Sequence, residues 1–211
     1  MRRDKRYKII NNYLNKERNA FIIGGGTSLK GFDLTRLDNE FTIAINHTIE
    51  HYPQADCLIF GDKIFLNKTT FDIRTYKGMI FCSEGAAYSY PMQEMIPQDN
   101  IFVFETLRDE PVINAKKGLY HPTSSGMMAI SLALQMHAKR IYLLGFDYYK
   151  VNGQMHWFKD YDHHKKYHDD KLKKKLKKFK NFEKHRGSII NLNPDSLIEE
   201  FQKKSIKDVF I

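Results

Sequence analysis

The chain has 211 residues, of which 42% are hydrophobic and 28% are charged, and this composition predicts one soluble globular domain. No apolar stretch approaches the roughly 20 residues needed to cross a bilayer, which excludes a membrane-spanning protein. The basic N-terminus lacks the apolar core of a signal peptide, so we expect a cytoplasmic protein that can also lie at the inner membrane face. The two cysteines, Cys57 and Cys82, lie within apolar runs and are expected to be buried thiols.

The net charge of +9 is concentrated in two segments. Residues 163–186 contribute +8 and residues 1–19 contribute +5, so the remaining chain carries −4. We expect residues 1–19 to form a basic amphipathic helix, over roughly residues 4–17. Two basic segments on a nearly neutral to acidic body favour contact with a phosphate-rich surface.

A short apolar run, Ala20–Ile23, is followed by three glycines, Gly24–Gly26, and then by Thr27 and Ser28. The pattern predicts a strand, a tight loop and the start of a helix. Glycines let a ligand approach the backbone, and a helix N-terminus offers unpaired N–H groups with a partial positive charge. An anionic ligand, most simply a nucleotide, is one interpretation, and a plain glycine turn between strand and helix is the other.

Strand-length apolar runs recur along the chain and alternate with helical patterns. They are rich in Ile, Phe, Val and Leu and lack period-two polarity, as expected for strands buried on both faces of a parallel sheet. Their ranges are 20–23, 41–45, 57–60, 78–81, 101–104, 140–144 and 188–192. Helices are expected at Ser124–His137 and Asp195–Lys204. The alternation predicts an α/β fold with a doubly wound, largely parallel, Rossmann-like sheet.

We divide the chain into a nucleotide-binding α/β core at 20–150, a lid segment at 151–186, and a C-terminal strand and helix at 187–211 that complete the core. The lid contains a lysine-rich helix whose apolar positions 172, 176, 179 and 182 form one narrow stripe. The interpretation we prefer is a solvated lid whose stripe rests on the body. The alternative is a basic helix that docks on an anionic acceptor, such as a glycan, a lipid surface or a nucleic acid backbone.

Small and polar residues follow several of the predicted strands, so they should meet at one edge of the sheet, where ligands bind in doubly wound folds. The start of the 124–137 helix adds three hydroxyls and a glycine. One hydroxyl suffices as a helix cap, which leaves Ser125 for a ligand. The predicted nucleotide-binding residues are Gly24, Gly25, Gly26, Ser28, Asn46, Asp62, Ser124, Ser125, Gly126 and Asp147.

Five motifs occur in order along the chain. They are Gly24-Gly25-Gly26-Thr27-Ser28-Leu29-Lys30 with Asp33 and Thr35-Arg36-Leu37, then Ile45-Asn46, Ser124-Ser125-Gly126, Ile141-Tyr142-Leu143-Leu144-Gly145-Phe146-Asp147-Tyr148-Tyr149 and Pro194-Asp195-Ser196-Leu197. In this order and spacing the chain resembles the small bacterial sialyltransferases that decorate lipooligosaccharide, together with phage and bacterial proteins of similar pattern. The resemblance covers most of residues 20–205.

The resemblance implies a Rossmann-like domain that binds a CMP-activated sugar, transfers the sugar with inversion and closes a lid over the donor. It also implies a lid histidine as general base toward the acceptor hydroxyl, and two residues that hydrogen-bond the leaving phosphate. By position these are His168 for the base, and Tyr149 and His156 for the phosphate. A histidine can take a hydroxyl proton, and a phenol or an imidazolium can stabilise charge on a phosphate. This chemistry requires no cofactor.

Four positions depart from the family pattern. Gly25 and Gly61 stand in place of asparagines, His47 in place of a glutamine, and Pro122 in place of an arginine. The lost amide and guanidinium contacts imply a nucleotide-sugar donor other than CMP-sialic acid. The prediction is a nucleotide-sugar-dependent glycosyltransferase of sialyltransferase-like type.

Two other functions stay open on the residues alone. Asp62 follows a strand opposite the glycine loop, where a carboxylate can anchor Mg²⁺ on a polyphosphate, and this suits a Mg-dependent pyrophosphokinase or phosphotransferase. The basic segments also suit a nucleotide- or nucleic-acid-binding protein without catalysis, although no recognition module is visible. Histidines and aspartates crowd residues 154–164, but no spacing there defines a metal site, and we predict none. A homo-oligomer is compatible with the sequence.

Overall fold

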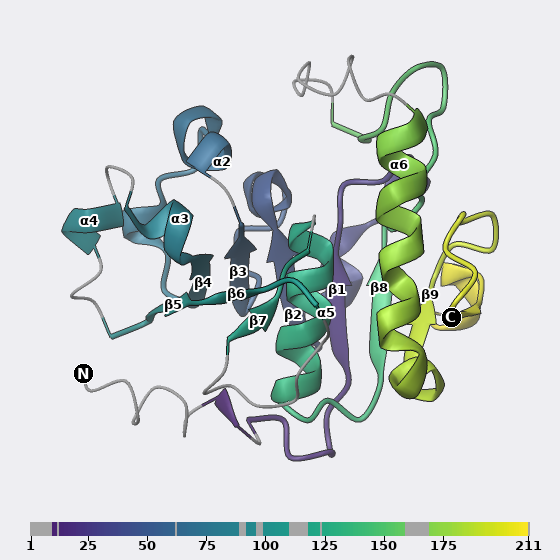
Figure 1. The fold of residues 1–211 in the computed structure, drawn as a ribbon, viewed down its shortest axis with the longest axis horizontal. Coiled ribbons are helices and arrows are strands. Elements are labelled where there is room, and N and C mark those ends of the chain that lie inside the picture. Colours follow the sequence, from purple (N-terminus) through teal and green to yellow (C-terminus); the bar gives the residue numbers. More distant parts are fainter. Residues whose placement is uncertain are drawn as a thin grey trace.

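The computed structural model describes residues 10, 11, 13–61, 63–88, 92–95, 99–109, 118–122, 124–158 and 169–210. An eight-stranded sheet runs through this part of the chain, and its neighbouring strands pair in parallel (Figure 1). Its strands are β1 (Ala20–Ile23), β2 (Phe41–Ile45), β3 (Cys57–Phe60), β4 (Met79–Ser83), β5 (Ile101–Phe104), β8 (Ile141–Leu144), β9 (Ile189–Asn191) and β10 (Gln202–Lys203). In space they follow the order β10-β9-β8-β1-β2-β3-β4-β5. This confirms the predicted doubly wound, Rossmann-like α/β fold.

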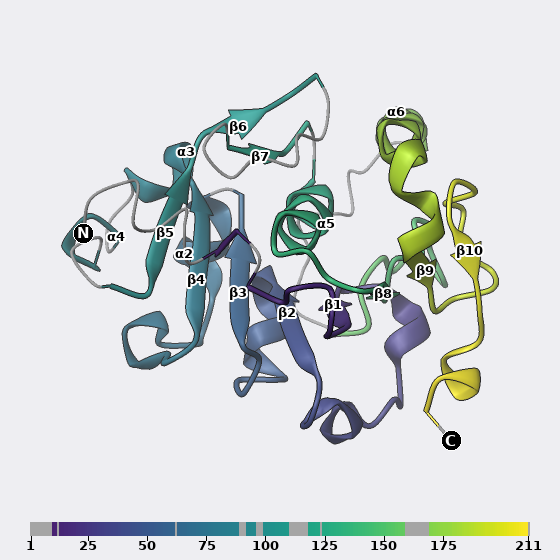
Figure 2. The same ribbon diagram turned by 90° about the horizontal axis from the view of Figure 1, so that it is seen from below.

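Helices cover both faces of the sheet, as the view in Figure 2 shows. The two longest helical segments lie on one face: α5 (Ser125–Gln135), and α6 (Asp169–Leu176), which continues as the 3-10 helix η6 (Lys177–Ser188). The other α-helices are α2 (Lys63–Lys68), α3 (Glu84–Ala87) and α4 (Met92–Met95). Short 3-10 helices are η1 (Thr27–Leu29), η2 (Leu34–Leu37), η3 (Asn46–Glu50), η4 (Ile73–Thr75) and η7 (Ile206–Asp208).

The sheet separates two buried apolar clusters, and alternate residues of β1 to β5, β8 and β9 supply them. Ile22 belongs to the cluster that contains α5, whereas Phe21 and Ile23 belong to the cluster on the opposite face. All residues of β1 and β8 are buried, as expected for strands covered on both faces. In the part of the chain that the structure describes, no helix has both the length and the apolar character to cross a bilayer.

The strand predictions are confirmed. The runs at 20–23, 41–45, 57–60 and 101–104 coincide with strands, and the other three differ from β4, β8 and β9 by one or two residues at an end. The helix expected at Ser124–His137 is α5. A second, two-stranded parallel sheet joins β6 (Thr106–Leu107) to β7 (Leu119–Tyr120). Strands of two residues carry no periodic pattern, so this pair was not predicted.

The helix predicted at Asp195–Lys204 is wrong. Residues 195–201 form turns, bends and irregular backbone, and Gln202–Lys203 pair with β9 as strand β10. The hydroxyl of Ser196 donates a hydrogen bond to the carbonyl of Phe146 at 2.6 Å, and the ammonium of Lys203 donates to the carbonyl of Ser196 at 2.7 Å. These tertiary bonds outweigh the weak helical preference of the segment.

The N-terminal helix predicted over residues 4–17 does not extend through the residues that are described there. Residues 13–18 form turns and bends, and Asn15 and Lys16 have left-handed backbone, with φ of 48° and 60°. Such conformations interrupt a right-handed helix. Residues 1–9 and 12 lie outside the described residues.

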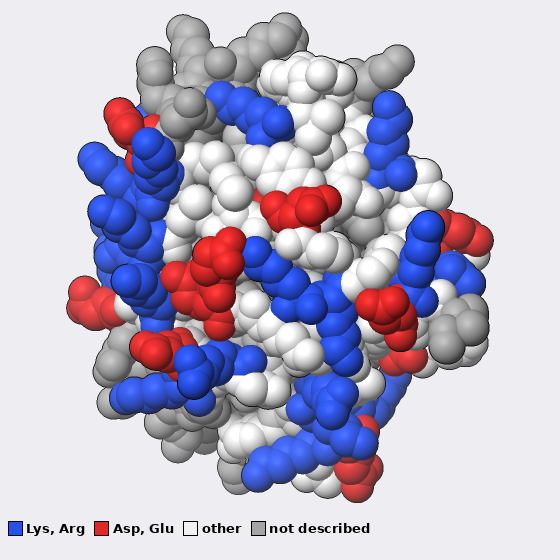
Figure 3. Space-filling view, turned by 90° about the vertical axis from the view of Figure 1, so that its right-hand side faces the viewer, with Lys and Arg blue, Asp and Glu red and all other residues white. Residues whose placement is uncertain are grey.

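The apolar stripe of the lysine-rich segment rests on the body. Phe179 and Phe182 are fully buried, Leu172 is 8% exposed, and Leu176 packs partly buried against the core. The lysines between these positions are mostly exposed. Lys and Arg side chains form a column along one edge of the face drawn in Figure 3. The packing of the stripe on the body is therefore confirmed, whereas the role of the segment as a lid and an anionic partner for its lysines stay predictions.

Candidate functional site

A cavity of about 390 Å³ lies at the carboxyl ends of β1 and β8. These two strands are neighbours, but the chain continues from β1 to β2 on one side and from β8 to β9 on the other. The loops after them leave in opposite directions, which opens a crevice at the topological switch point of a doubly wound sheet. Of the predicted residues, those that line the cavity are Gly24, Gly25, Gly26, Asn46, Ser124, Ser125, Gly126, Asp147 and His156.

The glycine loop lies directly against the end of β8. The backbone N–H of Gly24 donates to the carbonyl of Leu144 at 2.8 Å, and that of Gly26 donates to the carbonyl of Gly145 at 2.9 Å. A Cβ atom at Gly26 would lie 2.5 Å from Cγ of Asp147 and 2.6 Å from the Gly145 carbonyl oxygen. Glycine is therefore required at this position by the close approach of two loops.

Asp147 fastens the glycine loop. Its carboxylate is 2% exposed and accepts hydrogen bonds from the backbone N–H of Ser28 at 2.8 Å, from the Thr27 hydroxyl at 3.2 Å and from the Asn193 amide at 2.8 Å. The Ser28 hydroxyl donates to it as well. The structure joins Ser28 and Asp147 to each other, and Asp147 also lines the cavity, so the contact of either residue with a nucleotide stays a prediction. The bonds between Ser28 and Asp147 fix the position of the glycine loop at the cavity wall.

The start of α5 is held in a similar way. The Ser124 hydroxyl caps the helix by accepting from the backbone N–H of Gly126 at 3.1 Å, and it also lies 3.1 Å from the hydroxyl of Tyr148. The Ser125 hydroxyl accepts from the backbone N–H of Gly61 at 3.1 Å. The hydroxyl proposed for a ligand thus ties α5 to the loop after β3. The helix N-terminus, with its partial positive charge, faces the cavity.

Asn46 presents an unsatisfied polar atom at the cavity wall. It begins η3 directly after β2 and has left-handed backbone, with φ of 51°. Its side-chain oxygen Oδ1 is buried and accepts no hydrogen bond from any described residue. A buried acceptor without a donor costs about 1–3 kcal/mol, so a ligand that donates a hydrogen bond here would recover that energy.

His47 and Glu50 form a pair that sequence reasoning missed as a site. His47 lines the cavity, and its Nδ1 lies 2.7 Å from Oε1 of Glu50. The same oxygen accepts from the Thr69 hydroxyl at 2.8 Å and from the backbone N–H of Thr70 at 3.2 Å. Burial alone would raise the pKa of Glu50, but the hydrogen bonds from His47 and Thr69 outweigh it and lower that pKa. The ionised carboxylate therefore favours a proton on Nδ1 of His47.

His156 covers the glycine loop. Its ring lies against Gly25, at the position that a side chain of residue 25 would occupy, and the next backbone N–H, of Trp157, donates to the Gly25 carbonyl at 3.0 Å. The ring stacks on Phe158 with centroids 5.3 Å apart and planes 4° apart. Phe158 stacks in turn on His51 at 5.3 Å.

Burial decides the charge state of His156. Burial, aided by the neighbouring His47 and Lys175, lowers the pKa of His156 to about 4, and the Gly25 backbone and Asp147 act in the opposite direction. The imidazole is neutral at neutral pH and can act as a neutral N–H donor, and its role at a leaving phosphate stays a prediction. A phosphate placed beside it would raise its pKa again.

Tyr148 rather than Tyr149 lines the cavity in the described part of the chain. Tyr148 has left-handed backbone, with φ of 60°, and its ring packs edge-on to Phe179. The hydroxyl of Tyr149 instead accepts from the Asn193 amide at 3.3 Å, beside Asp147. The sequence could not distinguish these adjacent phenols, because the turn after β8 decides which one points inward.

Helix α6 contributes a further part of the wall. Leu172 and Lys175 both line the cavity, three residues apart on one side of the helix. Lys175 is the only lysine or arginine among the described lining residues, and Asp147 is the only carboxylate there, with its oxygens bonded within the protein. The described wall therefore favours an anionic ligand over a cationic one.

Other residues of the site were missed or cannot be placed. His121 lines the cavity and lies against Gly61, and no feature of the sequence had indicated it. The predicted residues Asp62 and His168 lie outside the described residues, as do His163 and His164. Among the residues that are described, no group of three or more histidines, cysteines and acids is arranged to hold a metal ion.

The lowered pKa of His156 predicts that the stability of the protein depends on pH. Its pKa is about 4 in the folded chain and 6.5 in the unfolded chain, so the unfolded chain binds the extra proton between these values. Stability should fall as the pH is lowered from about 6.5 to about 4, and His156 should account for up to about 3 kcal/mol of the loss. Urea denaturation of the parent and of His156→Gln across this window measures the difference. His185, whose pKa burial also lowers, is present in both proteins, so equal pH slopes would contradict the burial of His156.

No family model matches the sequence, and no curated protein matches it. Among solved structures, the chain is similar to the sialyltransferase CstII from Campylobacter jejuni in complex with the substrate analogue cytidine-5'-monophosphate. The TM-score is 0.53 and the identity 19%, over 90% of this chain and 85% of that one. It is also similar to the sialyltransferase CST-II in complex with a trisaccharide acceptor and CMP, with a TM-score of 0.52 and 17% identity over 89% of this chain and 86% of that one. At these identities the likeness establishes a shared, sialyltransferase-like fold.

Proposed function

We propose that this protein is a glycosyltransferase that binds a nucleotide-sugar donor in the cavity between the loops after β1 and β8. The observation that carries the proposal is the convergence of the glycine loop, Asn46 and the start of α5 on that one cavity. Lys175 and a helix N-terminus add positive potential there. The fold is shared with sialyltransferases solved with CMP and with a trisaccharide acceptor, which supports the same class of ligands.

The wall suggests how a pyrimidine nucleotide would lie. Its phosphate would sit beside the glycine loop, where neutral His156 can donate an N–H and Lys175 can supply charge. A hydroxyl of the ribose or an amino group of the base would donate to the buried oxygen of Asn46. The family that the chain resembles has amide side chains at three positions where this chain has Gly25, Gly61 and His47. We therefore propose a donor other than CMP-sialic acid.

We propose the transfer chemistry that the resemblance to the sialyltransferases implies. The acceptor hydroxyl would lose its proton to a histidine, for which His168 is the proposed base, and the leaving phosphate would be stabilised by hydrogen bonds from His156 and a phenol. Tyr148, which lines the cavity, and Tyr149, which was predicted from position, are the two phenols to compare. Donor hydrolysis in Tyr148→Phe and Tyr149→Phe separates their contributions.

A thermal-shift screen against nucleotides and nucleotide sugars, with and without Mg²⁺, tests the proposal. A ligand at about a hundred times its Kd stabilises the folded state by about 2.7 kcal/mol, which raises the unfolding midpoint. We expect a pyrimidine nucleotide to raise it without metal. A shift that requires Mg²⁺ would favour the pyrophosphokinase alternative through Asp62, and no shift with any nucleotide would overturn both.

A further inference from the structure

The exposed side of the lysine-rich helix carries an unusual density of positive charge. We call the six lysines Lys171, Lys173, Lys174, Lys177, Lys178 and Lys180 the α6 basic face; all are exposed. None of them forms an ion pair with a carboxylate of any described residue. The opposite side of the same segment is buried in the core through Phe179 and Phe182. The lysines are therefore held in a fixed array by a packed helix.

This array is unfavourable for the isolated protein. Lys171 and Lys174 are neighbours three residues apart in α6, and Lys177 and Lys180 eclipse each other three residues apart in η6. Each like-charged pair on a helix costs about 0.2–0.5 kcal/mol. Asp170 and Glu183 lie at helical spacing from some of these lysines, but no ion pair between them and the face forms among the described residues, and lysines outnumber acids in the segment. A bound polyanion would relieve the repulsion.

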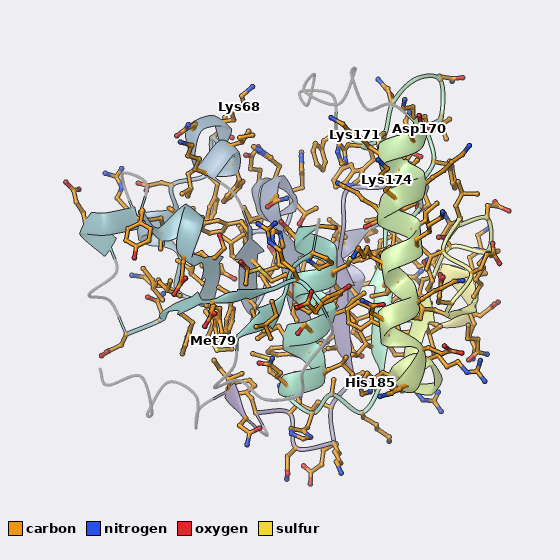
Figure 4. The ribbon with its side chains drawn as sticks, viewed as in Figure 1. Lys68, Met79, Asp170, Lys171, Lys174 and His185 are labelled. Carbon is orange, nitrogen blue, oxygen red and sulfur yellow. The ribbon has the colours of Figure 1, made fainter. Side chains whose placement is uncertain are left out.

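The α6 basic face is continuous with the cavity. Lys175 lines the cavity, and Lys171 and Lys178 lie one turn away from it on either side. Figure 4 shows Lys171 and Lys174 on the first turns of α6, at the same end of the molecule as Lys68 on α2. A row of ammonium groups thus leads outward from the site.

The α6 basic face is charged and lacks exposed large apolar side chains. Leu172, Phe179 and Phe182 are buried and Leu176 is partly buried, so neither phenylalanine of the described segment 170–186 is presented for stacking on bases. No exposed apolar side chain is available there to enter a bilayer. These features favour a linear polyanion that is held by its charges alone.

We propose that the α6 basic face is the acceptor-docking surface, and that the acceptor is a glycan bearing phosphate or carboxylate groups, whose end enters the cavity beside Lys175. The inference rests on the proposed function, because it names the acceptor class of that same site. It assigns the lysines to recognition of the acceptor, leaving the glycine loop and Asn46 to the donor.

Calorimetric titration with a heparin-derived oligosaccharide, as a linear anionic glycan, tests the surface. Three proteins are compared: the parent, a face variant with Lys173, Lys174, Lys177 and Lys178 changed to Gln, and a control variant with the exposed Lys30, Lys77, Lys139 and Lys207 changed to Gln. Both variants lose the same charge. We expect affinity to fall about tenfold or more in the face variant and by less than about threefold in the control, and to weaken steeply from about 50 mM to about 300 mM NaCl.

The same titrations separate this inference from the proposed function. A nucleotide that binds all three proteins, with no oligosaccharide binding or equal losses in both variants, would overturn the docking surface alone. Oligosaccharide binding through the α6 basic face without any nucleotide binding would support the surface and overturn the donor site. Tighter binding of phosphatidylglycerol vesicles or single-stranded DNA to the same lysines would overturn the glycan as the occupant.

Discussion

Replacing Asp147 by alanine is expected to lower the free energy of unfolding by about 3–5 kcal/mol. The change removes a buried carboxylate that accepts from the Ser28 backbone, from two hydroxyls and from the Asn193 amide. Asn193 is 4% exposed, so its amide would lose a partner that water cannot easily replace. The residues that follow the glycine loop would lose their side-chain attachment to the loop after β8, and nucleotide affinity should fall with it.

Denaturant unfolding with Asp33→Ala as the matched control measures this effect. Asp33 also accepts from a backbone N–H and a hydroxyl, both of Thr35, but it is exposed at the start of η2. Its loss should cost much less stability than the loss of Asp147, because water can replace its partners. Equal losses in the two variants would show that Asp147 is an ordinary surface cap and that the loop is held by other contacts.

Phe182→Ala is expected to cost about 3–5 kcal/mol of stability, because it would open a cavity under the lysine-rich segment. The ring is fully buried, packs edge-on to Tyr120 with centroids 5.4 Å apart and also contacts Phe201. The adjacent Asn181 amide donates to the Tyr120 hydroxyl at 2.7 Å, which fastens the same region.

Lys180→Ala, two residues away and exposed, should change stability by less than about 0.5 kcal/mol. A large difference between the two variants would establish η6 as part of the folded body. If Phe182→Ala cost less than about 1 kcal/mol, residues 177–188 would be a detachable lid, and the fixed array of lysines would not exist.

The strands could be predicted because each is a short apolar run buried on both faces, and such runs look alike wherever they occur in a parallel sheet. The carboxyl ends of parallel strands lie at one edge of the sheet. Gly24–Gly26, Asn46 and Ser125 could therefore be assigned to one site at that edge. The C-terminal segment could not be predicted by pattern. Asn191 and Ser196 bond to the Phe146 carbonyl, 45 and 50 residues away, and these contacts replace a helix with irregular backbone.

Within the site, the sequence identified positions but not partners. Ser28 and Asp147 are 119 residues apart, and only the structure shows that they bond to each other. Lys175 could have been predicted as a residue of the site. It lies three residues after Leu172 on the same side of the helix, and Leu172 is buried against the body. His47 follows Asn46 at the end of a predicted strand and so lay at the expected edge, but nothing indicated its pairing with Glu50, and the isolated His121 carried no periodic or spacing information.

Calorimetry with the pyrimidine nucleotide that most raises the unfolding midpoint, on the parent and on Gly25→Val, tests the central claim most directly. A side chain at residue 25 would collide with His156 and fill the space against the loop, whereas Gly187→Val, at a glycine with no atom near its Cβ position, serves as the control. We expect the parent and Gly187→Val to bind alike and Gly25→Val to bind at least about a hundredfold more weakly while remaining folded. Equal affinities in all three folded proteins would show that the glycine loop is only a turn and that this cavity is not the nucleotide site.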